Sequence, residues 1–163
     1  MGVIDIKCRT PKAALDKFFQ TAMRIVQKEV DKALSYLGAE CIIRIRDRRP
    51  EESWNDITGN LRSSIGFAVY DYGKKYIEST FAIVKEGGKG ASEGRRMIDE
   101  LASQYANVYA LVVIAGMNYA EQVEAMKNKD VLASTKSWAT QQVNDYIKKA
   151  QESAERRINQ IKL

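Results

Sequence analysis

The feature that most constrains the fold is a long amphipathic pattern between two prolines, Pro11 and Pro50. Thr10 and Pro11 suit a helix start, because threonine can cap a first turn whose N–H groups have no partner and proline lacks that group anyway. We expect the helix to run to about Arg48, because a proline disfavours helical backbone in the residue before it. Its apolar face has helical spacing and consists of Leu15, Phe18, Phe19, Ala22, Val26, Val30, Ala33, Leu34, Leu37 and Cys41.

The middle of the chain alternates as β-strands do. In residues 65–70 every second side chain is large and apolar, which predicts a strand with one buried face. A turn at 71–74 and a second alternating segment at 76–84 complete a β-hairpin. The run 108–115 is continuously apolar and rich in β-branched residues, which predicts a strand buried on both faces.

The end of the chain returns to helical spacing. A short helix is expected at 119–126, and Ser134 or Thr135 can cap a long last helix whose apolar stripe runs from Ala139 to Ile161. The chain has neither an internal repeat nor a linker, so we expect one domain over 1–163. The fold class is α+β, with long N- and C-terminal helices packed on a small, mainly antiparallel sheet that contains the β-hairpin.

Residues 85–94 contain four glycines and several charges, and we expect a mobile loop there, followed by a short helix. The stretch Gly87, Gly88, Lys89 and Gly90 superficially resembles a phosphate-binding loop. It lacks the GxxxxGK[ST] spacing, and no buried strand leads through it into a helix. A flexible loop is therefore the preferred interpretation, and its length suggests the hypothesis of a segment that becomes ordered when a partner docks.

Histidine is absent from the chain. Its absence removes the commonest general base, the usual nucleophile–histidine pairs and nearly all catalytic zinc arrangements. Carboxylates form only small groups, such as Glu121 with Glu124, without a convergent partner motif. We therefore expect no catalytic residues, no metal and no cofactor. Cys8 and Cys41 are far apart and are expected to be reduced thiols.

The start of the chain does not have the pattern of a signal peptide. The longest apolar run, 109–117, is far shorter than the roughly 20 residues of a membrane span. We expect a soluble, intracellular protein that makes no membrane contact. The net charge of +5 permits an anionic partner but does not require one.

The densest basic cluster consists of Arg44, Arg46, Arg48 and Arg49, interrupted by Asp47. One interpretation is a basic rim that faces DNA or a neighbouring subunit. The other is a solvated helix end, where cations lie favourably near the last carbonyl groups.

Tyrosines gather around the predicted hairpin turn at Tyr70, Tyr72 and Tyr76. Tyrosine offers a large contact area at a low entropic cost, so exposed groups of tyrosines often mark interfaces. Packing against the sheet of the same molecule is the alternative. Trp54 and Trp138 are expected to anchor the core or an interface.

Two segments, TGNLRSSI at 58–65 and YAEQVE at 119–124, resemble motifs of the head–tail joining, or tail-completion, proteins of long-tailed phages. The chain is similar to the versions from phages and prophages of gut Bacteroidetes, where a DVL follows, as at 130–132 here. The resemblance covers about residues 54–132, and it departs from the family at 85–105 and in the long last helix. The residues that carry it are Thr58, Gly59, Asn60, Leu61, Arg62, Tyr119, Ala120 and Glu124.

The resemblance implies an α+β subunit without catalysis that forms a ring between the portal-side connector and the tail tube or terminator, in the virion and, during assembly, in the host bacterial cytoplasm. It also allows non-specific contact with DNA that passes through the lumen. The motif at 58–62 has a purely structural explanation as well. Thr58 caps a short helical turn, and Gly59 and Asn60 suit a tight turn. Leu61 and Ile65 enter the core, and Arg62 pairs with a carboxylate.

Two other function classes stay open from the residues. The basic cluster motivates a DNA-binding protein associated with phage DNA packaging, and an enzyme such as a metal-dependent hydrolase has no positive support. For the connector interpretation, the candidate partner contacts are Tyr70, Tyr72, Tyr76 and the stretch 87–90.

Overall fold

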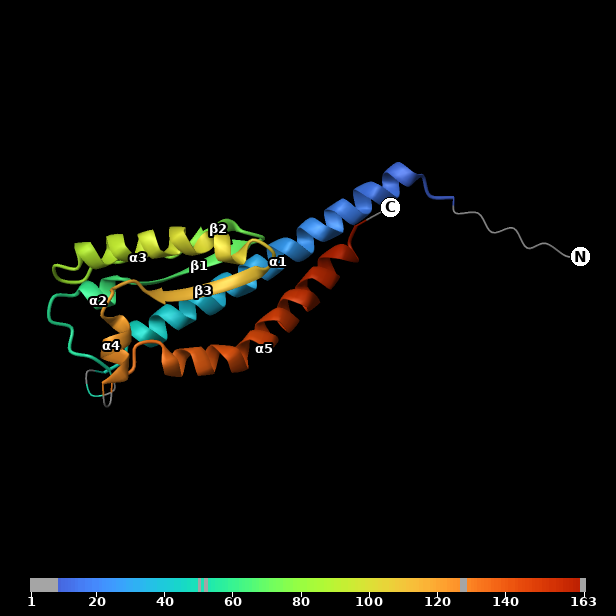
Figure 1. Cartoon of the computed structure of the whole chain (residues 1–163). Helices are drawn as coiled ribbons and strands as arrows, with labels where there is room; N and C mark the ends of the chain where they lie inside the picture. The colour runs from blue at the N-terminus through green and yellow to red at the C-terminus, as the bar shows by residue number, and fades with distance from the viewer. Residues whose placement is uncertain (1–8, 50, 52, 127–128, 162–163) are drawn as a thin grey trace, which may run out of the picture.

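The protein is described by a computed structural model, which covers residues 9–49, 51, 53–126 and 129–161. Two long helices and a three-stranded sheet dominate it, with shorter helices between them (Figure 1). The elements are α1 (Lys12–Arg46), α2 (Asn60–Ser63), β1 (Ile65–Asp71), β2 (Lys74–Glu78), α3 (Gly88–Leu101), the 3-10 helix η1 (Ala102–Tyr105), β3 (Tyr109–Ala115), α4 (Ala120–Ala125) and α5 (Ala133–Ile158). The α+β class, the long terminal helices and the β-hairpin are as the sequence predicts.

The strand order within the described residues is β2-β1-β3, with both pairs antiparallel. This order reverses the predicted burial of two strands. β1, expected to bury one face, is the central strand and is buried on both faces from Ile65 to Tyr70. β3, expected to be buried on both faces, is an edge strand whose Leu111 and Val113 are only half-buried. An apolar run indicates that a strand is buried, but it does not indicate whether the strand lies in the centre or at the edge of the sheet.

The sheet lies between two helical layers (Figure 1). α1 packs on one face, where Leu34 contacts Phe67 and Val69, and α5 runs along α1. α3 packs on the other face, where Ile98 and Phe81 join Tyr70 in a second cluster. A third apolar cluster, which includes residues of α1, α2 and α4, closes one end of the sheet.

α1 has 35 residues and is therefore about 50 Å long, far longer than the seven-residue strands that it crosses. The sheet ends near Gln27, whose side chain donates a hydrogen bond to Asp71 at the end of β1. Beyond this point α1 and the end of α5 continue together, and we call residues 12–26 with 150–161 the helical arm (Figure 1). The apolar face predicted for α1 is only partly buried, because on the arm Phe19 and Val26 are exposed.

The predicted mobile loop at 85–94 is wrong for most of its length, because α3 begins at Gly88. Gly90 and Gly94 lie on the face of α3 that packs closely against the rest of the protein. A Cβ on Gly90 would lie 1.9 Å from the carbonyl oxygen of Asn60, and one on Gly94 would lie 2.3 Å from the ring of Phe81. Glycine serves close packing here, not flexibility.

The second strand of the hairpin is shorter than predicted. β2 ends at Glu78, and the segment 79–87 leaves the sheet in an irregular path. Phe81 causes the departure, because its ring is buried against Gly66 and Gly94 beneath α3. Among the described helices, none combines the length and the apolar character that crossing a membrane requires.

Candidate assembly surfaces

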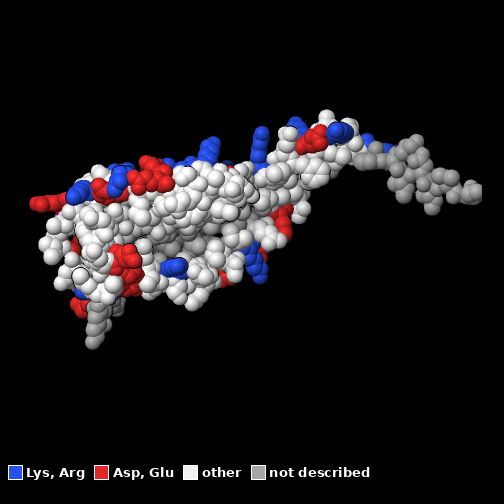
Figure 2. Space-filling model, in the orientation of Figure 1, with Lys and Arg blue, Asp and Glu red and all other residues white. Residues whose placement is uncertain are grey.

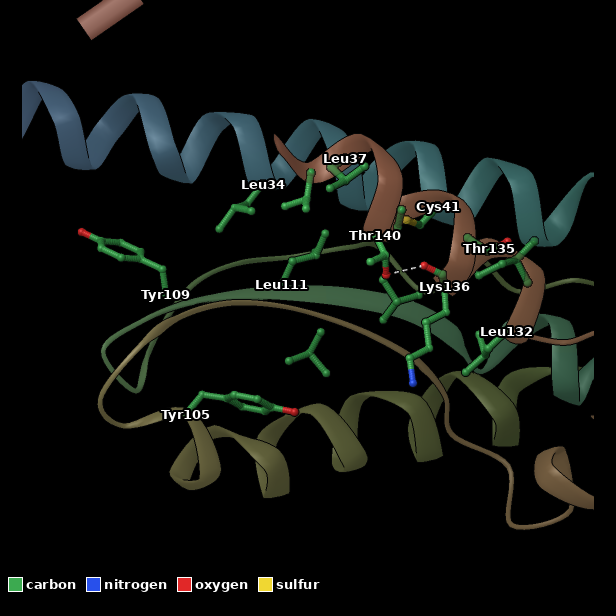
Figure 3. Close-up of a pocket in the computed structure, with 15 residues that line it drawn as sticks. Leu34, Leu37, Cys41, Tyr105, Tyr109, Leu111, Leu132, Thr135, Lys136 and Thr140 are labelled. Carbon is green, nitrogen blue, oxygen red and sulfur yellow. Dashed lines mark hydrogen bonds between the residues drawn. The ribbon is translucent and has the colours of Figure 1, made fainter. Parts of the chain in front are cut away.

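An open groove runs between the edge strand β3 and helix α5. Its volume is about 630 Å³, and its walls come from α1, α5 and β3 (Figure 3). In Figure 2 the same face of the molecule is hollowed beside α5, and a largely uncharged band crosses its middle. The lining residues include Leu34, Leu37, Cys41, Leu111, Val113, Ala139 and Val143.

The groove is uncharged apart from Lys136. Burial raises the pKa of the Cys41 thiol to about 11, so this thiol is neutral and unreactive near neutral pH. Burial and the neighbouring Asp71 raise the pKa of the Tyr109 hydroxyl to about 12, so this group is neutral as well. The surface suits an apolar or backbone-rich occupant better than an ionic one.

The three hairpin tyrosines have different environments. Tyr70 is fully buried, donates a hydrogen bond to the carbonyl oxygen of Ile98 at 2.5 Å, and stacks on Tyr105. This core position removes Tyr70 from the candidate contacts. Tyr72 and Tyr76 remain available, with 60% and 50% of their surface exposed.

The TGNLR segment has a structural role. Gly59 has a φ of +80°, and a Cβ there would lie 1.9 Å from the carbonyl oxygen of Val84. Asn60 accepts a hydrogen bond at Oδ1 from the N–H of Gly90, which ties α2 to the start of α3. Gly59, and not Thr58, occupies the N-cap position of α2, and Thr58 Oγ1 accepts only a long 3.4 Å contact from the N–H of Asn60.

Two further expectations for this segment are confirmed. Leu61 is buried, and Arg62 pairs with Asp56 at 3.1 Å while its guanidinium lies 5.2 Å from the centre of the Trp54 ring.

The predicted contact stretch from Gly87 to Gly90 lies beside this same segment, but its residues differ in what they face. A Cβ on Gly87 would lie 2.0 Å from Ser63 Oγ, whereas one on Gly88 would meet nothing within 4 Å. Lys89 is exposed and lines a shallow polar depression between α3 and α4. Of this predicted contact stretch, Gly88 and Lys89 therefore face outward, and Gly87 and Gly90 belong to the packing.

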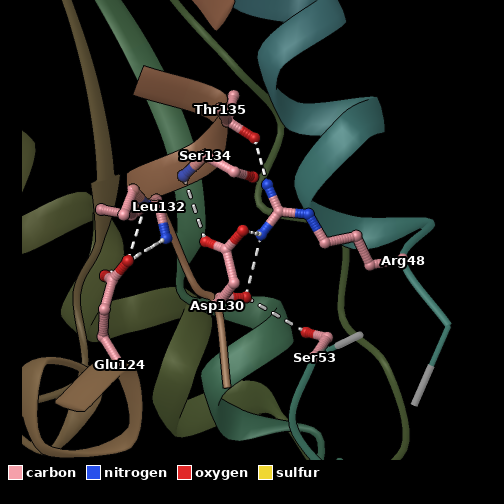
Figure 4. Close-up of polar contacts among 8 residues, drawn as sticks. Arg48, Ser53, Glu124, Asp130, Leu132, Ser134 and Thr135 are labelled. Atoms are coloured by element: carbon pink, nitrogen blue, oxygen red, sulfur yellow. Dashed lines mark hydrogen bonds and ion pairs between the residues drawn. The ribbon is translucent and has the colours of Figure 1, made fainter. Parts of the chain in front are cut away.

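The YAEQVE segment holds the start of α5 (Figure 4). The carboxylate of Glu124 accepts hydrogen bonds from the N–H of Leu132, at 3.1 and 3.2 Å, and from the N–H of Ala133, at 2.6 Å. A carboxylate is favourable there, because the first N–H groups of a helix lack partners and carry partial positive charge. α5 begins at Ala133 without a cap from its own first residues, so the predicted Ser134 or Thr135 cap is wrong. Ala120 is buried and Tyr119 half-buried.

Asp130 anchors the same corner. Its Oδ2 lies 2.7 Å from Arg48 Nη1, and its Oδ1 accepts a hydrogen bond from the N–H of Ser134. Burial alone would raise the pKa of Asp130, but the bonds from Ser134 and the charge of Arg48 outweigh it and hold this pKa below its usual value. Arg48 also donates to the carbonyl oxygen of Asp130 and to Thr135 Oγ1 (Figure 4).

The other members of the basic cluster diverge. Arg44 stacks on Trp138 of α5, with 3.8 Å between the guanidinium carbon and the ring centre. Arg46 donates to the carbonyl oxygen of Ala82 at 2.6 Å. Arg49 is exposed. The four arginines therefore do not form one continuous surface, because three of them turn toward groups of the same chain.

The burial of Asp31 is not predicted by the sequence pattern, which places this residue on the polar face of the long helix. Asp31 is 3% exposed, and its Oδ1 has no hydrogen-bond partner among the described residues. Burial, and after it the charge of Asp71, raise the pKa of Asp31 to about 6. No local pattern indicates this burial, because Asp31 stands with Lys28 and Lys32 among the charged positions of the helix.

The arm carries a second exposed apolar surface, which we call the arm stripe. Phe19, Met23 and Val26 follow one another at i, i+4 and i+7 on α1 and are 59%, 72% and 44% exposed. An exposed stripe of this kind is typical of a helix that meets another molecule.

Within the described residues, no group of three or more histidine, cysteine or acidic side chains gathers in a way that could hold a metal ion. Searches of known protein families, curated proteins and solved structures give no significant match to this chain.

Proposed function

We propose that this chain is a non-catalytic structural subunit that associates with copies of itself in a ring, and that the ring joins head and tail in a long-tailed phage. The observation that carries the proposal is the open architecture of the sheet. Both edge strands are unpaired among the described residues, and an apolar groove lies along one of them. A subunit that leaves such surfaces open is suited to completion by neighbours.

The assignment to phage head–tail joining rests on the two motifs, TGNLRSSI and YAEQVE. Their residues shape the corner where α2, α3, α4 and the start of α5 meet, through Asn60 with Gly90 and Glu124 with the first N–H groups of α5. Motifs that specify a scaffold in this way are useful to any subunit of the same architecture. In this proposal they define the fold of the subunit and do not contact its partners directly.

Binding of DNA through the basic cluster is not favoured. Arg44, Arg46 and Arg48 already have partners in the same chain, although Arg44, like Arg49, is exposed. A DNA-binding surface would need these charges to lie free beside one another.

The first experiment is mass by light scattering over a wide range of protein concentration, repeated after mixing with the portal-side connector and tail-terminator proteins of the same phage. We expect growth with concentration toward one closed species, and a stable complex with at least one of the two neighbours. A chain that remains monomeric at all concentrations and binds neither neighbour would show that the proposed function is wrong.

A further inference from the structure

The free edge of β3 presents backbone hydrogen-bonding groups to the groove. The N–H of Gly116 donates to the carbonyl oxygen of Ser64 at one end of the β1–β3 ladder, and the strands pair without a break up to Asp71. In an antiparallel ladder the directly bonded pairs alternate, so they fall at the even-numbered residues of β3. The N–H and C=O groups of Leu111 and Val113 therefore point away from β1, toward the open edge.

The helices that cover this face of the sheet are displaced sideways. α1 packs on β1 and β3, and α5 packs along α1 on the side of β3. The groove exists because α5 extends past the last strand. At the opposite edge β2 lacks this cover, and Ile77 is 41% exposed although it pairs with the buried Val69 on the α1 face. Among the described residues, helix α5 at the β3 edge therefore has no strand beneath it. At the β2 edge, the strand has no helix over the face that α1 covers elsewhere.

We propose that copies of this chain join head to tail through these two edges, so that β2 of one copy enters the groove along β3 of the next. α5 of the copy that provides the groove then covers the bare face of the β2 that enters it. The inference rests on the self-assembly proposed above and names the surfaces that carry it. The occupant is a second copy of this chain.

The register of the three strands predicts which residues of the two copies would lie side by side in such a joint. Ile77 pairs with Val69, and Val69 pairs with Leu111, so the three lie at one level across the sheet. A copy added without a shift along the strands brings its Ile77 beside Leu111 of its neighbour. The apolar side chain then enters the part of the groove that Ala139 and Val143 line.

The joint is heterologous, because it uses different surfaces on the two copies. Repetition of such a contact closes into a ring when the rotation between copies allows it. Lys74, Lys75 and the bulge between Val69 and Tyr70 lie toward the turn end of β2. Charges and bulges of this kind discourage unlimited edge pairing, so they confine the contact to the other end of the strand, around Ile77.

The test uses two variants of the full chain. Ile77→Lys places a charge on the exposed edge of β2, and Ala139→Lys places one in the wall of the groove. Each leaves the other edge intact, and each is expected to stay monomeric where the wild type assembles. Ile57→Lys is the matched control, because Ile57 is 85% exposed and lies outside both edges. This control is expected to assemble as the wild type does.

Mixing the two variants gives the decisive measurement. The Ile77→Lys copy keeps a working groove and the Ala139→Lys copy keeps a working β2, so an equal mixture should form dimers and nothing larger. Circular dichroism of each variant before mixing identifies any that has failed to fold, and Val143→Lys then replaces a misfolded Ala139→Lys.

The outcomes separate the inference from the proposed function. Assemblies of wild-type size in both variants would overturn the edge pairing and leave self-assembly standing, with the arm stripe as the contact to examine next. A mixture that stays monomeric overturns the head-to-tail arrangement. A wild-type chain that never associates overturns both the inference and the self-assembly on which it rests.

Discussion

Asp31 shows how a single residue links this fold to pH. Its carboxyl is buried between α1 and the end of the sheet, where Asp71 takes a hydrogen bond from Gln27 and lies beside Tyr109. Burial first, and then Asp71, raise its pKa to about 6, whereas the value in an unfolded chain is about 3.9. The native state therefore binds this proton more tightly than the unfolded state. Through this group the free energy of unfolding falls as pH rises from about 4 to about 6 and then stays at the lower value.

Replacement of Asp31 by asparagine should remove this penalty, because the amide is neutral at every pH. We expect Asp31→Asn to raise the free energy of unfolding by about 3 kcal/mol at about pH 8, and to change it little at about pH 4. Urea unfolding at both pH values measures the difference. Asp16→Asn, on the exposed surface of the arm, serves as the charge-matched control. An equal effect of Asp31→Asn at both pH values would contradict the assignment.

Glu124 is a second residue with a specific role, because it supplies the cap that α5 lacks in its own sequence. Glu124→Ala should lower the free energy of unfolding by about 1–2 kcal/mol, the usual cost of losing a helix cap. Denaturant unfolding provides the measurement. Glu121→Ala, an exposed change on the same short helix, should stay within about 0.5 kcal/mol of the wild type. Equal losses in the two variants would argue against a capping role.

At the scale of elements, the packing of α3 depends on which of its glycines face the rest of the protein. Gly90 and Gly94 lie where a neighbouring backbone or the Phe81 ring leaves no room for a Cβ, while Gly88 faces open space. The helix can lie close to α2 and β1 because the buried side of its first two turns carries nothing larger than the methyl group of Ala91. The same residues would weaken an isolated helix.

Alanine at these two positions should have opposite effects. Alanine favours a helix over glycine by up to about 1 kcal/mol, so Gly88→Ala should leave thermal stability unchanged or raise it. Gly90→Ala should lower the midpoint of thermal unfolding, because its Cβ would lie 1.9 Å from the carbonyl oxygen of Asn60. A Gly90→Ala protein as stable as Gly88→Ala would mean that α3 does not pack on α2 in this way.

At the scale of the whole molecule, the protein consists of a layered body and a two-helix arm. The body buries the sheet between α1 and α3, whereas the described part of the arm is held by the contact between α1 and α5 alone. The part of α1 over the sheet is buried at Leu34, Leu37 and Ile45, and the part in the arm exposes Met23. A single helix therefore has one well-supported half and one weakly supported half.

Hydrogen exchange should report this difference along α1. We expect amides of residues 34–45 to exchange much more slowly than those of 14–22. The hydrogen bonds of 34–45 break only when the body unfolds, whereas those of 14–22 break by local unfolding of the arm. Exchange followed by mass spectrometry in dilute protein makes the comparison. Repetition at concentrations that favour assembly shows whether the arm stripe gains protection. Uniform protection along α1 in the monomer would contradict a weakly supported arm.

The sequence by itself determined the elements whose signals are local. The spacing of apolar residues predicted α1, α5 and α4, alternation predicted the hairpin, and a continuous apolar run predicted the strand at 108–115. All three patterns follow from the geometry of a single segment. Arg62 and Leu61 were also placed correctly, since a short motif with a tight turn constrains its own surroundings. Glycine content misled the prediction at α3, although Gly87, Gly90, Ala91 and Gly94 recur at helical spacing.

Only the tertiary structure decided which strand lies in the centre of the sheet and which surfaces stay open. Strand order, the sideways displacement of α5 and the burial of Asp31 depend on contacts between residues far apart in the chain, and no local pattern encodes them. Tyr70 and Tyr72 illustrate the limit, because two neighbouring tyrosines on one hairpin are respectively fully buried and 60% exposed. Tyr70 is buried because it lies in the central strand beneath α3, whereas Tyr72 lies in the turn after β1 ends. The packing of α3 on this strand is a property of the assembled fold.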